Sequence, residues 1–161
     1  MILPARVPAI AGLLLAGLAG CSGPDEPAPV QAGLVQPDCY TVDLYQPPRY
    51  VEPGPDVPAT HTDYLGQWGG GAWNGLVCHD LWVLEVDGDG RVTMLDAHGP
   101  GLYPDATAFE RVGTIDGNGR LNVRKGTSRV QYWIEDGRLH GVRRRGDQEI
   151  RIIMERRSAA G

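Results

Sequence analysis

From Tyr64 onward, short runs of alternating apolar and polar residues are separated by turns rich in glycine and aspartate. Alternation over four to eight residues is typical of a strand with one buried and one exposed face. The clearest unit joins 81–86 to 91–95 through Asp-Gly-Asp-Gly at 87–90, which predicts a hairpin. Further hairpins are predicted within 111–124 and 129–143, followed by a last strand at 149–155.

Alternation also assigns side chains to the two faces of the predicted sheet. Tyr132 shares a face with Val130, whereas Trp133 shares the opposite face with Arg129. One buried and one wet face is typical of an antiparallel sheet, and closing that sheet into a barrel removes its exposed edges. We therefore predict an all-β fold, an antiparallel meander of about seven or eight strands closed or nearly closed as a small barrel. A proline-rich extended arm precedes it.

The first residues have the layout of a secretory signal. Arg6 is followed by an apolar segment at 7–18, which is too short to span a bilayer as a permanent helix. The sequence Leu18-Ala19-Gly20-Cys21 resembles the lipobox of bacterial lipoproteins. That resemblance implies cleavage before Cys21 and its acylation, palmitate included, and so a membrane anchor in the bacterial cell envelope. Because Ser22 follows rather than aspartate, it also implies an outer-membrane lipoprotein facing the periplasm. An ordinary secretory signal is the alternative.

The chain divides into four predicted parts: a signal peptide at 1–20, a tether or arm at 21–60, the β-barrel domain at 61–157 and a disordered tail at 158–161. Nine of the thirteen prolines lie between Pro24 and Pro58. Proline lacks the backbone N–H and fixes φ, so this stretch cannot form a regular helix or a central strand. We expect it to be extended and semi-rigid.

Once Cys21 is assigned to lipid, two cysteines remain in an oxidising compartment. A disulfide between Cys39 and Cys78 closes a loop of about 40 residues and stabilises the fold by roughly 3–4 kcal/mol on the loop-entropy model. Such a bond pins the end of the arm to the barrel. Two free thiols are the alternative.

The net charge of −5 conceals a strong asymmetry along the chain. From Arg120 to the end there are eleven basic and five acidic residues, whereas fifteen acidic residues precede Arg120. Such a division indicates an acidic arm on a basic surface, a face for an anionic partner, or arginines that only solvate outward faces. Candidate binding residues on this basic part are Trp133, Arg129, Arg143 and Arg144. A surface of this kind suits a glycan, an anionic lipid or a protein. The alternative is that it lies beneath the arm. Nucleic acid is not expected as a partner in this compartment.

The domain begins with Leu65-Gly66-Gln67-Trp68, then Gly71-Ala72-Trp73, a pattern that resembles the calycin barrels, lipocalins and avidins among them. The resemblance implies that a tryptophan, Trp68 or Trp73, closes the barrel floor beneath an arginine of the last strand, Arg151 or Arg156. A second resemblance, in architecture, is to lipid-anchored inhibitors of metalloproteases and lysozymes. These combine a lipobox, a tether, a disulfide and an eight-stranded barrel.

Candidate chemistry is sparse. His61, His79, His98 and His140 show no metal-binding spacing, and Cys78-His79-Asp80 cannot act together because adjacent side chains of a strand point to opposite faces. Asp87–Gly90 and Asp116–Gly119 fit hairpin turns better than calcium loops. We therefore expect no enzyme, no metal and no cofactor.

The resulting hypothesis is a lipid-anchored envelope protein that is not an enzyme. Its barrel binds a small apolar ligand. Its interior site would be lined by Trp82, Val130, Tyr132 and Ile150. The alternative hypothesis is a protein-binding or inhibitory module that uses loops and the surface around Trp133. The former predicts a hollow barrel, and the latter predicts a solid core and an envelope protein as partner.

Overall fold

A computed structural model describes residues 39, 41–42, 44, 46–99 and 105–157 of the chain. The predicted signal, the predicted acylation site Cys21, most of the predicted tether and the tail therefore lie outside the described residues. Within the described part, no helix is both long and apolar enough to cross a bilayer.

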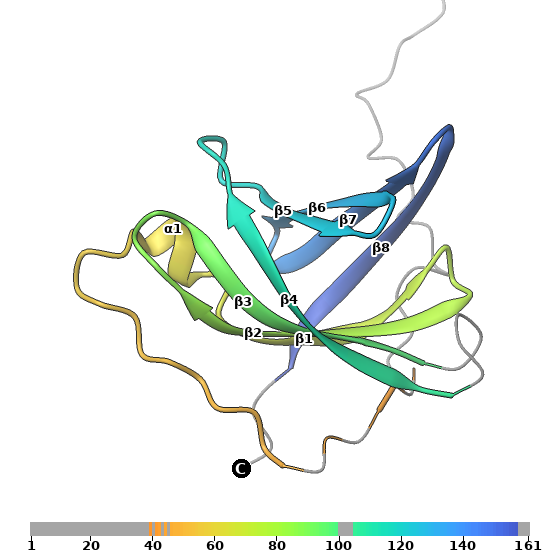
Figure 1. Ribbon diagram of the computed structural model, residues 1–161, viewed down its shortest axis with the longest axis horizontal. Coiled ribbons are helices and arrows are strands. Elements are labelled where there is room, and N and C mark those ends of the chain that lie inside the picture. Colours follow the sequence, from red (N-terminus) through yellow and green to blue (C-terminus); the bar gives the residue numbers. More distant parts are fainter. Residues whose placement is uncertain (1–38, 40, 43, 45, 100–104, 158–161) are drawn as a thin grey trace, which may run out of the picture.

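Eight antiparallel strands close into one barrel in sequence order, with β1 pairing to β8 (Figure 1). One helical turn, α1 (Ala59–Thr62), precedes them. The strands are β1 (Gly66–Trp73), β2 (Val77–Val86), β3 (Arg91–His98), β4 (Thr107–Ile115), β5 (Leu121–Lys125), β6 (Ser128–Glu135), β7 (Arg138–Arg145) and β8 (Gln148–Arg157). The all-β class, the meander and the closure predicted from sequence are confirmed.

The turns form as their sequences predict. The Asp87 carboxylate accepts a hydrogen bond from the Arg91 N–H at 2.8 Å, and the Asp116 carboxylate accepts one from the Asn118 N–H at 2.9 Å. Each aspartate therefore caps the backbone of its own hairpin, as short polar side chains commonly do in turns. The hairpin interpretation of these glycine-rich segments is confirmed.

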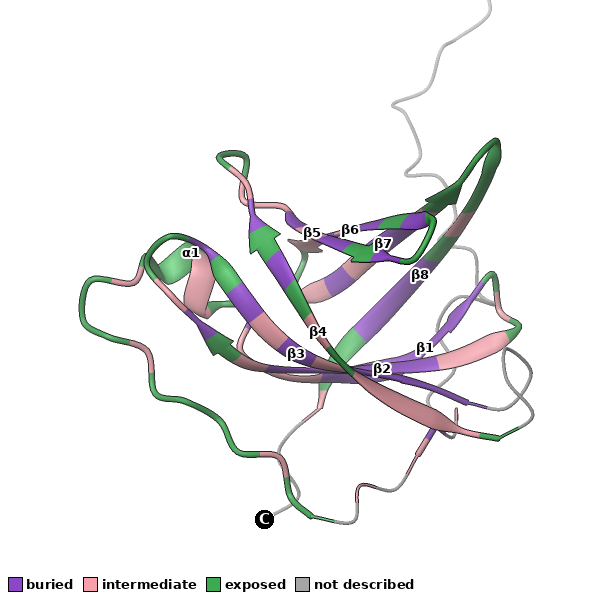
Figure 2. Ribbon diagram, viewed as in Figure 1, coloured by how far each residue is buried: buried purple, intermediate pink, exposed green. Residues whose placement is uncertain are grey.

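The middle of the barrel is filled by inward-facing side chains (Figure 2). They alternate with more exposed ones along β5 and β6, whereas β1 and β2 are buried over most of their length. Tyr132, Leu121, Met94 and Ile152 are among the fully buried ones. Gly141 makes room for the Tyr132 ring, because a Cβ there would lie 2.8 Å from that ring. Close packing of this kind is typical of protein interiors.

One end of the barrel is closed by aromatic side chains; we call it the floor. Trp68 is fully buried and donates a hydrogen bond from Nε1 to the Tyr64 carbonyl at 2.8 Å. The Arg156 guanidinium lies over the Trp68 ring, 4.1 Å from its centroid, and donates to the carbonyls of Asp63 and Leu65. Of the pairs that the calycin resemblance allowed, the floor contains Trp68 with Arg156.

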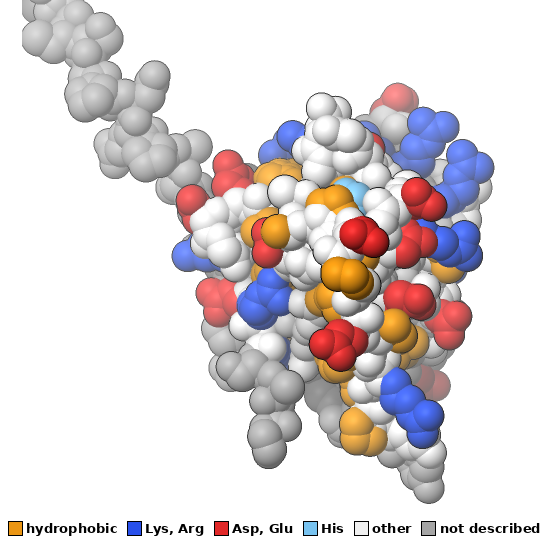
Figure 3. Space-filling view, turned by 90° about the vertical axis from the view of Figure 1, so that its left-hand side faces the viewer, with side chains coloured by type: hydrophobic (Ala, Val, Ile, Leu, Met, Phe, Trp, Pro, Cys, Tyr) orange, Lys and Arg blue, Asp and Glu red, His pale blue; other side chains and the backbone are white. Residues whose placement is uncertain are grey.

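On the α1 side of the molecule, acidic side chains are scattered over the surface and the arginines lie mainly toward its edges (Figure 3).

The arm crosses the outer face of β1 and β2 and is held there covalently. Cys39 and Cys78 form a disulfide with a Cα–Cα distance of 5.3 Å, which confirms that prediction. Two residues beyond each cysteine, Thr41 of the arm donates a hydrogen bond to the buried Asp80 carboxylate of β2. Trp82 follows on the same outer face and lines a groove against the arm. The assignment of Trp82 to the barrel interior was therefore wrong. The inner face of β2 is buried in the core, and its outer face, which carries Trp82, is buried beneath the arm.

Candidate functional site

At the end of the barrel opposite the floor, which we call the mouth, the inner faces of four strands bring ionisable side chains together. His79 comes from β2, Asp96 and His98 from β3, Lys125 from β5 and Tyr132 from β6. All five are buried. They hold the inward positions that follow from the alternation of each strand, for example two residues beyond Met94 and Val123 in the core. We call these five residues the buried polar cluster.

The cluster is organised around the Asp96 carboxylate. Its Oδ1 atom lies 2.6 Å from Lys125 Nζ, 3.3 Å from His79 Nε2 and 3.5 Å from His98 Nε2. The Tyr132 hydroxyl is 3.1 Å from His79 Nε2 and 3.4 Å from Lys125 Nζ. The two imidazoles approach through their Nδ1 atoms at 3.3 Å. The side chains of Asp96 and Lys125 are 0% and 5% exposed, so this ion pair is shielded from water.

Burial and neighbouring charges shift the pKa values in this cluster. Burial lowers the pKa of Lys125 to about 8, although the adjacent Asp96 charge opposes that change. Burial, followed by the Lys125 charge, lowers the pKa of His79 well below 6.5, so its imidazole is neutral at pH 7. Burial acts to raise the pKa of Asp96, but Lys125 and the two imidazoles outweigh it, so the net shift is downward. Clusters of shifted ionisable groups are typical of functional sites.

Further cations surround the cluster at the mouth. Arg111 of β4 points inward, with Nε 3.5 Å from Asp96 Oδ2. Arg143 and Arg145 of β7 occupy the inward positions after Leu139 and Gly141, and they line a hollow of 180 Å³ with Gln148 and Ile150. The positive charge of Arg143 also acts on Lys125 and Tyr132.

The charges on the inner faces at the mouth do not balance. Among the described strands, the inward positions at this end carry Lys125 and three arginines but a single carboxylate, that of Asp96. In addition, Trp73 Nε1 is buried and lacks a hydrogen-bond partner among the described residues. Buried polar groups are normally paired, because leaving one unpaired costs about 1–3 kcal/mol. The mouth therefore presents the unpaired Trp73 donor and excess positive charge.

A metal ion fits this arrangement poorly. One ligand atom from each of His79, Asp96 and His98 lies within 4.8 Å of the others, a spacing that a metal could bridge. However, Lys125 Nζ already contacts the Asp96 oxygen that a metal would need, and Arg111 lies on the other oxygen. A divalent cation would meet two permanent or near-permanent positive charges at close range.

The candidate binding residues from the sequence separate onto different surfaces. Tyr132 belongs to the buried polar cluster and Arg143 lines the mouth, whereas Arg129, Arg144 and Trp133 face outward. Trp133 lies beneath Arg120 at 5.1 Å and stacks on His140 at 5.5 Å. These contacts on the outer wall come from the barrel itself, and the described part of the arm lies over β1 and β2.

Sequence reasoning missed the centre of the site. His79, Asp96, His98 and Lys125 were not recognised because they belong to three strands and have no short-range motif. One signal could have found two of them: Asp96 and Lys125 continue the inward alternation of Met94 and Val123, and a charge at an inward position requires a partner.

Comparison of this chain with protein-family models, with curated proteins and with solved structures found no match.

Proposed function

We propose that this protein is a lipid-anchored component of the bacterial cell envelope whose barrel binds a small anionic ligand at its mouth. The observation that carries this proposal is the excess of positive charge on the inner faces at that end. Lys125, Arg111, Arg143 and Arg145 are opposed there by Asp96. A bound anion would supply the missing counter-charge.

The energetics favour an anion held by arginine. Charges interact more strongly in a partly desolvated site than in water, and guanidinium–oxyanion hydrogen bonds are among the stronger ones in proteins. Arg143 and Arg145 offer planar donors above the buried polar cluster, and Lys125 lies beneath them. The hollow at their side chains, 180 Å³, suits a small molecule rather than a polymer. An apolar ligand would leave these donors unpaired.

The buried polar cluster beneath the arginines would hold the cationic side chains of the mouth in place rather than catalyse a reaction. Asp96 fixes Lys125 and both imidazoles, and the neutral His79 ring contacts the Tyr132 hydroxyl. We therefore keep non-enzymatic binding as part of the proposal. The closed floor, with Arg156 over Trp68, is consistent with the calycin resemblance.

The location of the protein rests on the sequence around Cys21, and the disulfide supports it. A bond between Cys39 and Cys78 suits an exported protein because cytoplasmic thiols are kept reduced. Metabolic labelling with palmitate tests the anchor: we expect label on the native chain and none on Cys21→Ser. Equal labelling of both would refute acylation at that cysteine.

Isothermal titration of the Cys21→Ser chain with inorganic phosphate, sulfate and citrate tests the ligand class. Arg143→Gln and Arg138→Gln remove the same charge from two positions of β7, one facing the mouth and the other on the outer wall opposite Glu135 and Glu155. We expect binding of at least one anion, weakened about tenfold by Arg143→Gln and less than twofold by Arg138→Gln. Absence of binding by all three anions, or equal losses in the two variants, would refute an anion site at the mouth.

A further inference from the structure

A second group of arginines lies on the outside of the barrel, away from the mouth site. Arg124 of β5 pairs in register with Arg129 of β6, and Arg129 pairs with Arg144 of β7. We call these three residues the outer arginine row. Like charges directly opposite each other on neighbouring strands are destabilising, so this arrangement has a cost for folding that an anionic partner would relieve.

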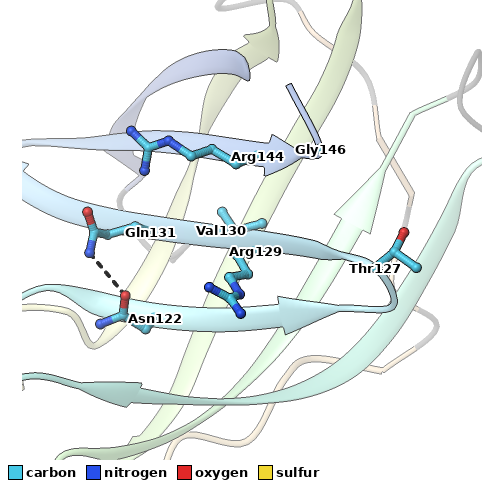
Figure 4. A pocket seen from close by; sticks show the side chains of 7 residues that line it. All are labelled: Asn122, Thr127, Arg129, Val130, Gln131, Arg144 and Gly146. Carbon is cyan, nitrogen blue, oxygen red and sulfur yellow. Dashed lines mark hydrogen bonds between the residues drawn. The ribbon is translucent and has the colours of Figure 1, made fainter. Parts of the chain in front are cut away.

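The row borders a concave surface on the same wall. A groove of 580 Å³ is lined by Asn122, Arg129, Gln131 and Arg144, with Thr127 at the turn between β5 and β6. Figure 4 shows Arg129, Gln131 and Asn122 gathered over β5 and β6, with Arg144 on the neighbouring strand. The Gln131 side-chain amide donates a hydrogen bond to Asn122 Oδ1 at 3.0 Å, which holds these two groove-lining side chains in place.

The arginines of the row are unequally neutralised. Arg144 pairs with Glu149 at 2.9 Å, while among the described residues no carboxylate pairs with Arg124 or Arg129. Adjacent strands are about 4.8 Å apart, so the three backbone positions of the row follow one another across the wall at roughly that interval. A linear polyanion that lies across the strands could therefore meet all three arginines.

We propose that the outer arginine row binds an acidic glycan, a chain of sugars that carries carboxylate or similar anionic groups. The arginines would pair with the anionic groups, and the amides and the Thr127 hydroxyl would contact sugar hydroxyls. None of the exposed large hydrophobic side chains of the described residues lies on β5, β6 or β7. Protein interfaces are enriched in aromatic anchors, and membrane-inserting surfaces carry exposed apolar side chains, so a soluble polar polyanion fits this wall better.

The test is isothermal titration of the Cys21→Ser chain with polygalacturonate fragments, which carry a carboxylate on each sugar, and with neutral dextran. Arg138→Gln is the matched control for Arg129→Gln, because Arg138 lies on the same wall but opposite Glu135 and Glu155. We expect polygalacturonate alone to bind, about tenfold more weakly after Arg129→Gln and less than twofold after Arg138→Gln. Thermal unfolding at low salt should show Arg129→Gln to be more stable than the unsubstituted chain, because the substitution removes two like-charge contacts.

Three results would overturn the proposal. The first is no binding of polygalacturonate. The second is an equal loss in the two variants, which would indicate only general charge attraction. The third is binding of polyglutamate or of phosphatidylglycerol vesicles at least as tight and equally dependent on Arg129, which would assign the wall to acidic proteins or to a membrane.

Discussion

Replacing Asp96 with asparagine removes the counter-charge of the buried polar cluster while keeping the shape of the side chain. Lys125 Nζ, 2.6 Å from the carboxylate, would lose its ionic partner, and Arg111 would lose the charge 3.5 Å away. Breaking a buried ion pair by removing one partner costs about 3–5 kcal/mol. Small domains are stable by only about 5–15 kcal/mol, so Asp96→Asn should remove a large part of the unfolding free energy.

Urea unfolding at pH 7, followed by tryptophan fluorescence, measures this change. Asp89→Asn is the matched control because Asp89 is exposed in the turn between β2 and β3, and its effect should stay within about 0.5 kcal/mol. The double variant Asp96→Asn with Lys125→Met should be more stable than Asp96→Asn alone, since it leaves no unpaired ammonium. If Asp96→Asn costs no more than Asp89→Asn, the pair is not the centre of the cluster and this reasoning is refuted.

Three further variants test other parts of the account. Because the pKa of His79 is lowered below its unfolded value, the folded state binds fewer protons, so stability falls as the pH drops below 6.5. Urea titrations should show a loss of about 2 kcal/mol by pH 5 that His79→Gln abolishes and His140→Gln keeps. Arg156→Met, which takes the guanidinium from the floor, should lower thermal stability by about 1–2 kcal/mol, and an unchanged melting temperature would contradict that role. Replacing Cys39 and Cys78 together by serine should cost roughly 3–4 kcal/mol, and a cost below 1 kcal/mol in chemical unfolding would argue against loop closure as the mechanism.

Local patterns were sufficient to predict the barrel. The alternation of Val130 and Tyr132 against Arg129 and Trp133 predicted the two faces of β6 correctly. Glycine-rich turns predicted the hairpins, because the pairing of strands that are neighbours in sequence depends on the turn between them. Closure followed because a meander with one apolar face must cover its edges.

Long-range arrangements were beyond the reach of these patterns. Trp82 was assigned inward because alternation cannot distinguish a buried inner face from an outer face covered by another segment, here the arm. The buried polar cluster was missed because Asp96 and Lys125 are 29 residues apart and meet only when the barrel closes. Arg143 and Arg144 read as one basic run in the sequence, yet the pleat directs them to opposite sides of the barrel wall.

Native mass spectrometry of the Cys21→Ser chain, gently purified from its own host, tests the anionic ligand at the mouth most directly. The account predicts a small adduct that fragments to a negatively charged molecule, is retained in Arg138→Gln and is lost in Arg143→Gln. A bare protein mass, or an adduct that survives Arg143→Gln, would contradict the account.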